Sequence, residues 1–115
     1  MQIRETDDAG LPVIHISGEV DLHGSPDLRS VLQRFAKMRP AAIALDLSEV
    51  TYIDSSGLAT IVEYVRSSHA FSGRIALAGL NPRVKTIFDL VRLGEILPIV
   101  ATLADARDVL GVPPA

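Results

Sequence analysis

The tetrad Asp54-Ser55-Ser56-Gly57 stands where a run of apolar strand residues gives way to a helical pattern. Residues 41–47, upstream, have the composition of a buried strand. Downstream, apolar residues recur at the i, i+3, i+4 and i+7 spacing of one helix face, at Leu58, Ile61, Val62 and Val65. The two serines therefore lie at or near a helix N-terminus, where free backbone N–H groups and the helix dipole favour an anion. A serine in this place is either a helix cap or a phosphate acceptor.

Strand and helix patterns alternate along the rest of the chain. Ser25-Pro26 and Asn81-Pro82 each have the order of an N-cap residue followed by a proline at the first helical position. Thr102 is a third candidate cap, and Pro98 favours an edge position for the last strand. We expect strands at residues 2–6, 13–17, 41–47, 74–79 and 97–100, and helices at 25–39, 55–70, 81–91 and 102–110. The predicted fold is α/β, with a mixed, partly parallel sheet of four to five strands packed with four helices.

Two of the expected strands alternate small and large apolar residues. Each has alanine at every second position, and the residues between are isoleucine or leucine, in Ala42-Ile43-Ala44-Leu45 and Ile75-Ala76-Leu77-Ala78. Because side chains alternate between the two faces of a strand, the alanines line one face of the sheet. This pattern predicts that a helix packs closely over the alanine face.

Composition excludes several classes of protein. The chain has 115 residues, 48% of them apolar, as in a single globular domain. It contains no cysteine, which excludes disulfides, thiolate chemistry and cysteine-based zinc sites. The net charge is −3 and the basic residues are spread along the chain, so we expect no nucleic-acid partner. With no membrane-length apolar run and no secretory signal, we expect a cytoplasmic protein that does not insert into membranes.

No enzyme or cofactor motif is found in the sequence. Neither the phosphate-binding loop nor the dinucleotide fingerprint is present, and Ile53 stands where a nucleophile elbow would need its first glycine. The three histidines, His15, His23 and His69, lack a metal-binding spacing. We therefore expect no cofactor, no metal and no catalytic residue, and a protein that is not an enzyme.

Three aspartates follow or end expected strands, namely Asp21, Asp46 and Asp54. In open α/β sheets, functional sites gather beyond the carboxyl ends of the strands. Aspartate also fills turn and cap positions well. These residues are therefore either turn and cap residues or an acidic rim beside Ser55.

Four motifs in this order resemble the STAS domain, in its branch of anti-sigma factor antagonists. They are Gly18-Glu19-Val20-Asp21, Leu45-Asp46-Leu47-Ser48, Asp54-Ser55-Ser56-Gly57-Leu58 and Asn81-Pro82-Arg83-Val84. The likeness extends from about Val13 to Leu110. It implies that residues 1–115 form a single STAS domain, with a short flexible tail from about residue 112.

The resemblance also implies a function. The serine directly after the aspartate, Ser55, would be phosphorylated, and Asp21, Asp54, Ser56 and Gly57 would form the surrounding switch and binding surface. The unmodified protein would bind an anti-sigma factor that is itself a serine kinase with a GHKL-type ATPase fold. Phosphorylation would end that complex, and a serine phosphatase would restore it. The oligomeric state stays open.

Two alternatives to this interpretation remain from the sequence. Ser56 is a second hydroxyl, so either serine is a candidate for modification. Isolated domains of this kind also serve as accessory subunits of ABC-type membrane transporters. An enzyme with Ser55 as nucleophile is a third class, but no base stands at a defined spacing from that residue.

Overall fold

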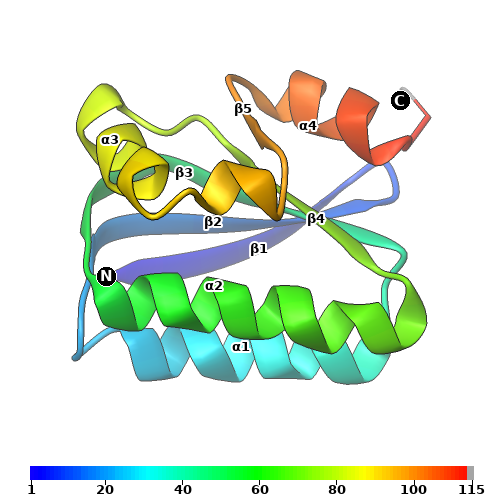
Figure 1. The fold of residues 1–115 in the computed structure, drawn as a ribbon. Helices are drawn as coiled ribbons and strands as arrows, with labels where there is room; N and C mark the ends of the chain where they lie inside the picture. The colour runs from blue at the N-terminus through cyan, green and yellow to red at the C-terminus, as the bar shows by residue number, and fades with distance from the viewer. Residues whose placement is uncertain (114–115) are drawn as a thin grey trace.

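The computed structural model of the chain describes residues 1–113 (Figure 1). Its strands are β1 (Gln2–Asp8), β2 (Leu11–Val20), β3 (Ala42–Ile53), β4 (Arg74–Ala78) and β5 (Ile99–Val100). Its α-helices are α1 (Ser25–Met38), α2 (Ser55–Ser68), α3 (Pro82–Leu90) and α4 (Leu103–Leu110). The sheet has the order β1-β2-β3-β4-β5, with β1 antiparallel to β2 and all other neighbours parallel. The predicted mixed sheet packed with four helices is confirmed, and β5 is an edge strand as Pro98 indicated.

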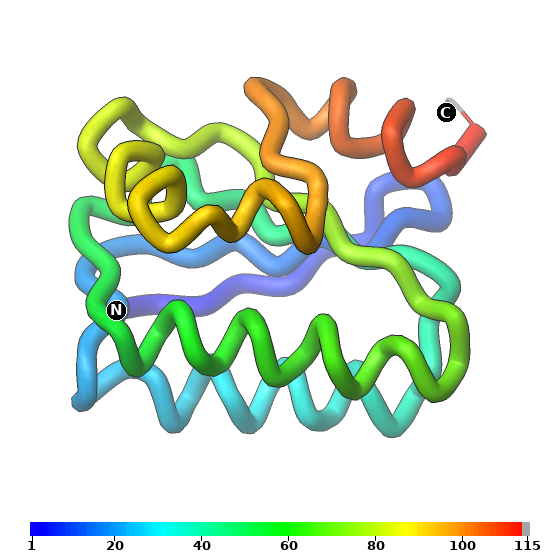
Figure 2. Tube along the Cα trace, in the orientation of Figure 1, coloured from blue at the N-terminus to red at the C-terminus, as the bar shows by residue number. Residues whose placement is uncertain are grey.

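The helices cover both faces of the sheet (Figure 1). Helices α1 and α2 lie side by side on one face (Figure 2). Val84 and Phe88 of α3 join the same core as the buried residues of α1 and α2, whereas α4 packs on the other face, over the strand alanines. Both α1 and α2 follow a strand that ends at the same end of the sheet, so the two helices begin there and run in the same direction (Figure 2). The carboxyl ends of β2 and β3 thus meet the N-termini of two helices.

The helices are short compared with a membrane span. The longest, α1 and α2, have 14 residues each. Within residues 1–113, no helix combines the length and the apolar character that crossing a membrane requires.

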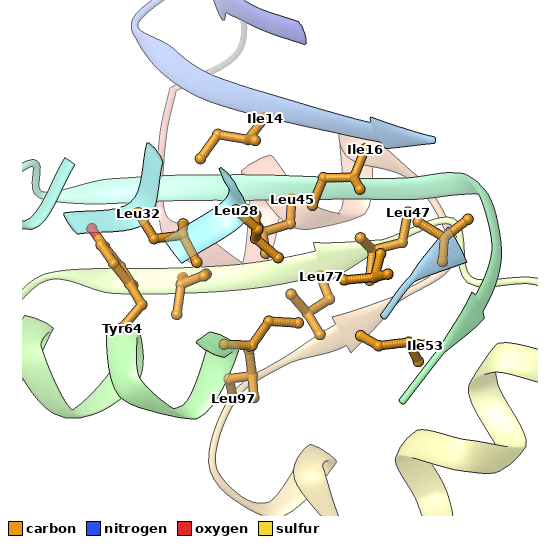
Figure 3. Close-up of a cluster of buried hydrophobic side chains, with 14 of the residues drawn as sticks. Ile14, Ile16, Leu28, Leu32, Leu45, Leu47, Ile53, Tyr64, Leu77 and Leu97 are labelled. Atoms are coloured by element: carbon orange, nitrogen blue, oxygen red, sulfur yellow. The ribbon is translucent and has the colours of Figure 1, made fainter. Parts of the chain in front are cut away.

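The main core fills the space between the sheet and the helices (Figure 3). Helix α2 contributes Ile61 and Val65, which are buried, whereas the predicted apolar positions Leu58 and Val62 are half-buried. Burying a side chain of this size fully stabilises the folded state by about 1.5–3 kcal/mol. The i, i+3, i+4 pattern therefore identified the correct face of the helix.

A second, smaller core lies under α4 and confirms the prediction from the alanine pattern. It joins Leu11 and Val13 of β2 and the strand alanines to α4, through Ala44, Ala76, Ala78, Ala106 and Leu110. In the sheet register Ala44 is directly opposite Ala76, so the small residues of β3 and β4 lie side by side. This leaves room for α4 to approach the sheet closely.

Strands β2 and β3 are longer than predicted. The expected end of β2 near Gly18 is wrong, because the strand continues through Gly18, which has φ +86, and its register with β3 shifts there. A bulge of this kind lets a strand bend without ending. Strand β3 continues to Ile53 rather than stopping at residue 47, although Ser48 and Glu49 are exposed.

The predicted cap of α1 is also wrong. The N-cap is Gly24, and Ser25 is the first helical residue. Instead of capping, the Ser25 hydroxyl donates to the backbone carbonyl oxygen of Asp21, at 2.7 Å. The side chains of Asn81 and Thr102 cap α3 and α4 as predicted.

The segment expected to be a flexible tail is partly held by contacts. Val112 packs against the second core, and the carbonyl oxygen of Pro113 accepts a hydrogen bond from the Arg107 guanidinium at 2.6 Å. Arg107 is buried and also donates to the backbone carbonyl of Asp8, so it ties α4 to the end of β1. The remainder of the predicted tail, residues 114–115, lies outside the described residues.

Enlarging the alanine face should destabilise the fold. We expect Ala44→Leu to lower the free energy of unfolding by about 1–3 kcal/mol, because the added atoms must enter the closed space under α4. Denaturant unfolding measures the change. The matched control is Ala59→Leu on the exposed side of α2, with an expected change within about 0.5 kcal/mol. Equal stabilities of the two variants would contradict close packing of α4.

Candidate functional site

The end of the sheet where α1 and α2 begin brings two of the three predicted aspartates together. Asp21 follows β2, Asp54 follows β3, and the backbone N–H of Asp54 donates to the carbonyl of Val20 at 3.0 Å. This is the edge where sites of open α/β sheets gather. The third aspartate, Asp46, does not join them, because it lies inside β3.

Asp54 is the N-cap of α2. Its Oδ1 accepts hydrogen bonds from the backbone N–H groups of Ser56 and Gly57, at 2.9 and 3.3 Å. The same oxygen accepts the Ser56 hydroxyl at 2.5 Å. The hydrogen bond from the Ser56 hydroxyl lowers the pKa of the Asp54 carboxyl most. Partial desolvation raises it, but the backbone N–H groups of Gly57, Ser56 and Leu22 lower it further, so the pKa lies below its usual value. Asp54 is therefore a charged cap at neutral pH.

Ser55 is the first residue of α2, and its side chain is exposed. Among the described residues, no hydrogen bond engages its hydroxyl. The reading of Ser55 as a helix cap is therefore wrong, because Asp54 performs that role. The Ser55 hydroxyl is left free to meet another molecule.

Ser56 differs from Ser55 although the two are adjacent. It is half-buried, and its Oγ lies between two oxygens: Asp54 Oδ1 at 2.5 Å and Ser25 Oγ at 2.6 Å. The contact with Ser25 joins the first turn of α2 to the first turn of α1. The two serines that the sequence left equivalent thus have different surroundings.

Gly57 is buried where α2 begins, next to the ends of two strands. A Cβ at this position would lie 2.7 Å from Cγ1 of Ile53 and 2.7 Å from Cγ1 of Val20. The absence of a side chain is what allows the first turn of α2 to lie directly on the ends of β2 and β3.

Asp21 closes the turn that connects β2 to α1. Its Oδ1 accepts the backbone N–H groups of His23 and Gly24, at 3.0 and 3.1 Å. Leu22, at the tip of this turn, is 74% exposed. Neither Leu22 nor Tyr52, which is also exposed near the end of β3, was predicted to be a site residue. Their apolar character predicts burial, and only the turn and the strand end explain their exposure.

Asp46 forms a separate polar pair inside the sheet. Its Oδ2 lies 2.7 Å from Nδ1 of His15, and Nε2 of His15 lies 2.9 Å from the Thr6 hydroxyl. Burial raises the pKa of the Asp46 carboxyl, but hydrogen bonds from Ser48 and His15 outweigh this and lower it. The contacts among Thr6, His15 and Asp46 connect β1, β2 and β3. Within residues 1–113, no group of three or more His, Asp or Glu side chains is placed to hold a metal ion.

The charged cap should make stability depend on acid. Because the folded-state pKa of Asp54 is lowered, its contribution to stability is present above the unfolded-state pKa of about 3.9 and is lost as the pH falls through the folded-state value. Asp54→Asn keeps a capping side chain without the charge. We expect its free energy of unfolding to fall less than that of the unchanged protein between about pH 6 and about pH 2, measured by urea denaturation. Parallel pH profiles would contradict a charged cap.

Gly57→Ala should destabilise the protein, although alanine is the better helix former. The added Cβ must displace Ile53 and Val20, with an expected cost of about 1–3 kcal/mol in the free energy of unfolding. The opposite change on the exposed side of the same helix, Ala59→Gly, should cost about 1 kcal/mol through helix propensity alone. A gain in stability for Gly57→Ala would show that the helix start has room to move.

Comparison with known proteins adds to this geometry. A family model described as the STAS domain matches residues 1–106. An anti-sigma F factor antagonist of Paenibacillus polymyxa is 30% identical over 100 residues, which are 86% of this chain and 86% of that protein.

Solved structures share the fold. An anti-sigma factor antagonist from Mycobacterium paratuberculosis superposes with a TM-score of 0.88 at 24% identity, over 96% of this chain and 93% of that one. The Bacillus cell fate determinant SpoIIAA in its phosphorylated form gives a TM-score of 0.72 at 22% identity, over 95% and 99% of the chains. The matched family model and the Paenibacillus relative decide the assignment: this chain belongs to the STAS domain family, in its branch of anti-sigma factor antagonists.

Proposed function

We propose that this protein is an anti-sigma factor antagonist whose binding is switched off by phosphorylation of Ser55. In the unmodified state it binds an anti-sigma factor that is also a serine kinase. The kinase transfers phosphate to Ser55 and the complex dissociates, until a serine phosphatase removes the phosphate. The observation that carries the proposal is the exposed, unengaged hydroxyl of Ser55 beside a charged cap, in a chain of this family.

The fold can accept a phosphate at this position. Phosphorylation adds about −1.5 to −2 charges and three acceptor oxygens. Ser55 is the first residue of α2, where backbone N–H groups and the positive end of the helix dipole stabilise an anion. Since the side chain is exposed, the phosphate remains in water and displaces no core residue. The modified protein should therefore stay folded.

The same phosphate opposes binding of a partner. Asp54 is already charged, and Asp21 lies at the same end of the sheet. A partner that covers this end must remove water from those carboxylates and from an added dianion. Placing like charges together at an interface costs several kcal/mol. A loss of about 3–4 kcal/mol corresponds to a several-hundred-fold loss of affinity.

Exposed apolar side chains beside the charged residues support the proposal that the partner is a protein. Leu22 is 74% exposed, on the turn whose backbone faces Asp54, and Tyr52 is 43% exposed two residues before Asp54. Exposed aromatic and aliphatic side chains of this kind commonly anchor protein interfaces. No imidazole or carboxylate among the described residues contacts the Ser55 hydroxyl, so the partner must supply the base for phosphoryl transfer.

Two substitutions test the switch. We expect Ser55→Ala to bind a purified anti-sigma factor serine kinase as tightly as the unchanged protein, and to remain bound when ATP is added. Ser55→Asp should bind more weakly without ATP, although one charge will reproduce only part of the phosphate effect. Titration calorimetry with and without ATP measures both, and phosphosite mapping by mass spectrometry identifies the modified residue.

The matched control is Ser67→Ala, an exposed serine near the other end of α2. It should bind and be released by ATP like the unchanged protein. Release of Ser55→Ala by ATP would contradict the proposed site. Capture of a transporter ATPase subunit from cells, unaffected by ATP, would instead support the accessory-subunit alternative.

A further inference from the structure

We infer that Ser25 determines which of the two adjacent serines receives the phosphate, because it covers the hydroxyl of Ser56 and leaves Ser55 as the acceptor. This inference rests on the proposed function, since it concerns the specificity of the same phosphoryl transfer. It assigns a role to a residue on a different helix, far from the tetrad in sequence.

Hydrogen bonding alone would favour Ser56 as the acceptor. Its Oγ lies 2.5 Å from Oδ1 of the ionised Asp54. A hydroxyl that donates to a carboxylate has a base positioned to take its proton, which is the usual arrangement of an activated nucleophile. Ser55 has no such contact. Access, rather than activation, must therefore explain a preference for Ser55.

Ser25 blocks that access. Its side chain is only 3% exposed, and its Oγ lies 2.6 Å from Oγ of Ser56. Phosphoryl transfer needs the phosphorus about 3–3.5 Å from the attacking oxygen, with the leaving group in line behind it. One side of the Ser56 oxygen faces Asp54 and another faces Ser25. An incoming phosphate would collide with Ser25.

The hydroxyl protons of Ser25 and Ser56 are both used in contacts other than the one between these two serines. Three oxygen–oxygen contacts connect Asp54, Ser56, Ser25 and the Asp21 carbonyl, at 2.5, 2.6 and 2.7 Å. Only the two serine hydroxyls can supply protons, because the carboxylate is ionised and the carbonyl has none. Ser56 donates to Asp54 and Ser25 donates to the carbonyl, so no proton is left for the contact between the two serine oxygens. The Ser25 oxygen therefore occupies this side of the Ser56 oxygen without donating to it, and it blocks approach by its position.

Ser25 is held in its place over Ser56 by its own contacts. The backbone N–H of Ser25 donates to the carbonyl of Asp21 at 2.8 Å, and the residue begins α1 directly before Pro26. The preceding residue, Gly24, is buried. The backbone of Ser25 is therefore fixed, and its buried hydroxyl is held by the contacts with the Asp21 carbonyl and the Ser56 oxygen.

Removal of the Ser25 hydroxyl should expose Ser56 as a second phosphate acceptor. In Ser25→Ala the Ser56 oxygen would attack the γ-phosphorus of ATP bound to the kinase. The bond to the β-phosphate oxygen breaks, ADP leaves, and the hydroxyl proton passes to the Asp54 carboxylate. The only co-reactant is ATP, which the kinase supplies.

The test compares Ser55→Ala with Ser55→Ala/Ser25→Ala, each incubated with a purified anti-sigma factor serine kinase and ATP. We expect no phosphate on Ser56 in the first. In the second we expect Ser56 to be modified at a rate on the order of 100-fold above the detection limit for the first variant, because its reacting atom is no longer blocked. Phosphosite mapping by mass spectrometry measures both.

Ser55→Ala/Ser68→Ala is the matched control. Ser68 is a buried serine at the far end of α2 whose hydroxyl donates to the carbonyl of Val65 at 2.7 Å. This variant also loses a buried hydroxyl but leaves Ser56 covered, so it should gain no phosphate. Ser55→Ala/Ser25→Thr keeps the covering hydroxyl and should also gain none. Retained binding to the kinase shows that each variant is folded.

The outcomes separate the two proposals. Phosphate on Ser56 in Ser55→Ala alone, or none in a folded Ser55→Ala/Ser25→Ala, would overturn the role of Ser25 while leaving Ser55 as the switch. If the unchanged protein took phosphate on neither serine, the proposed function would fail and this inference with it.

Discussion

The ionised carboxylate of Asp54 is the constraint on which the rest of the site depends. The backbone N–H of Asp54 connects the end of β3 to β2, and the carboxylate Oδ1 accepts two backbone N–H groups of the first turn of α2. Because Asp54 satisfies these donors, the next residue is not needed as a cap. A serine hydroxyl in that next position can therefore stay exposed at a helix N-terminus without any loss to the fold.

Close packing at the helix start is the second requirement. Asp54 reaches the first turn of α2 only because the helix begins directly on the ends of β2 and β3, and Gly57 is what permits this approach. The same packing brings the turn after β2 against α2, where Ser25 meets Ser56. One glycine thus determines both the position of the cap and the contact between the two helices. The exposed surface around Ser55 is shaped by residues that are themselves buried.

Local patterns predicted the helices well, whereas contacts between distant segments escaped the sequence. The i, i+3, i+4 spacing located α2, and the caps of α3 and α4 were correct, because both signals depend on neighbouring residues. The end of β2 was misplaced because the register shift at Gly18 appears only once β2 pairs with β3. Ser25 was expected to be a cap, since nothing local indicates a contact with a residue 31 positions away. The resemblance to the family pointed to Ser55, but only the fold distinguishes its surroundings from those of Ser56.

The proposed switch requires one added charge to be harmless for folding and costly for binding, and the Asp54 carboxylate explains how both can hold. Three donors already satisfy its Oδ1, so a phosphate on Ser55 would meet a carboxylate whose charge is partly neutralised by the helix start. Water screens the remaining repulsion while the site is open. A partner that covers the site removes that water, and the repulsion between phosphate and carboxylate then acts at its full strength. The loss of binding free energy on phosphorylation therefore comes from removing water at the interface. This requires an acceptor that is exposed in the free protein and covered by the partner.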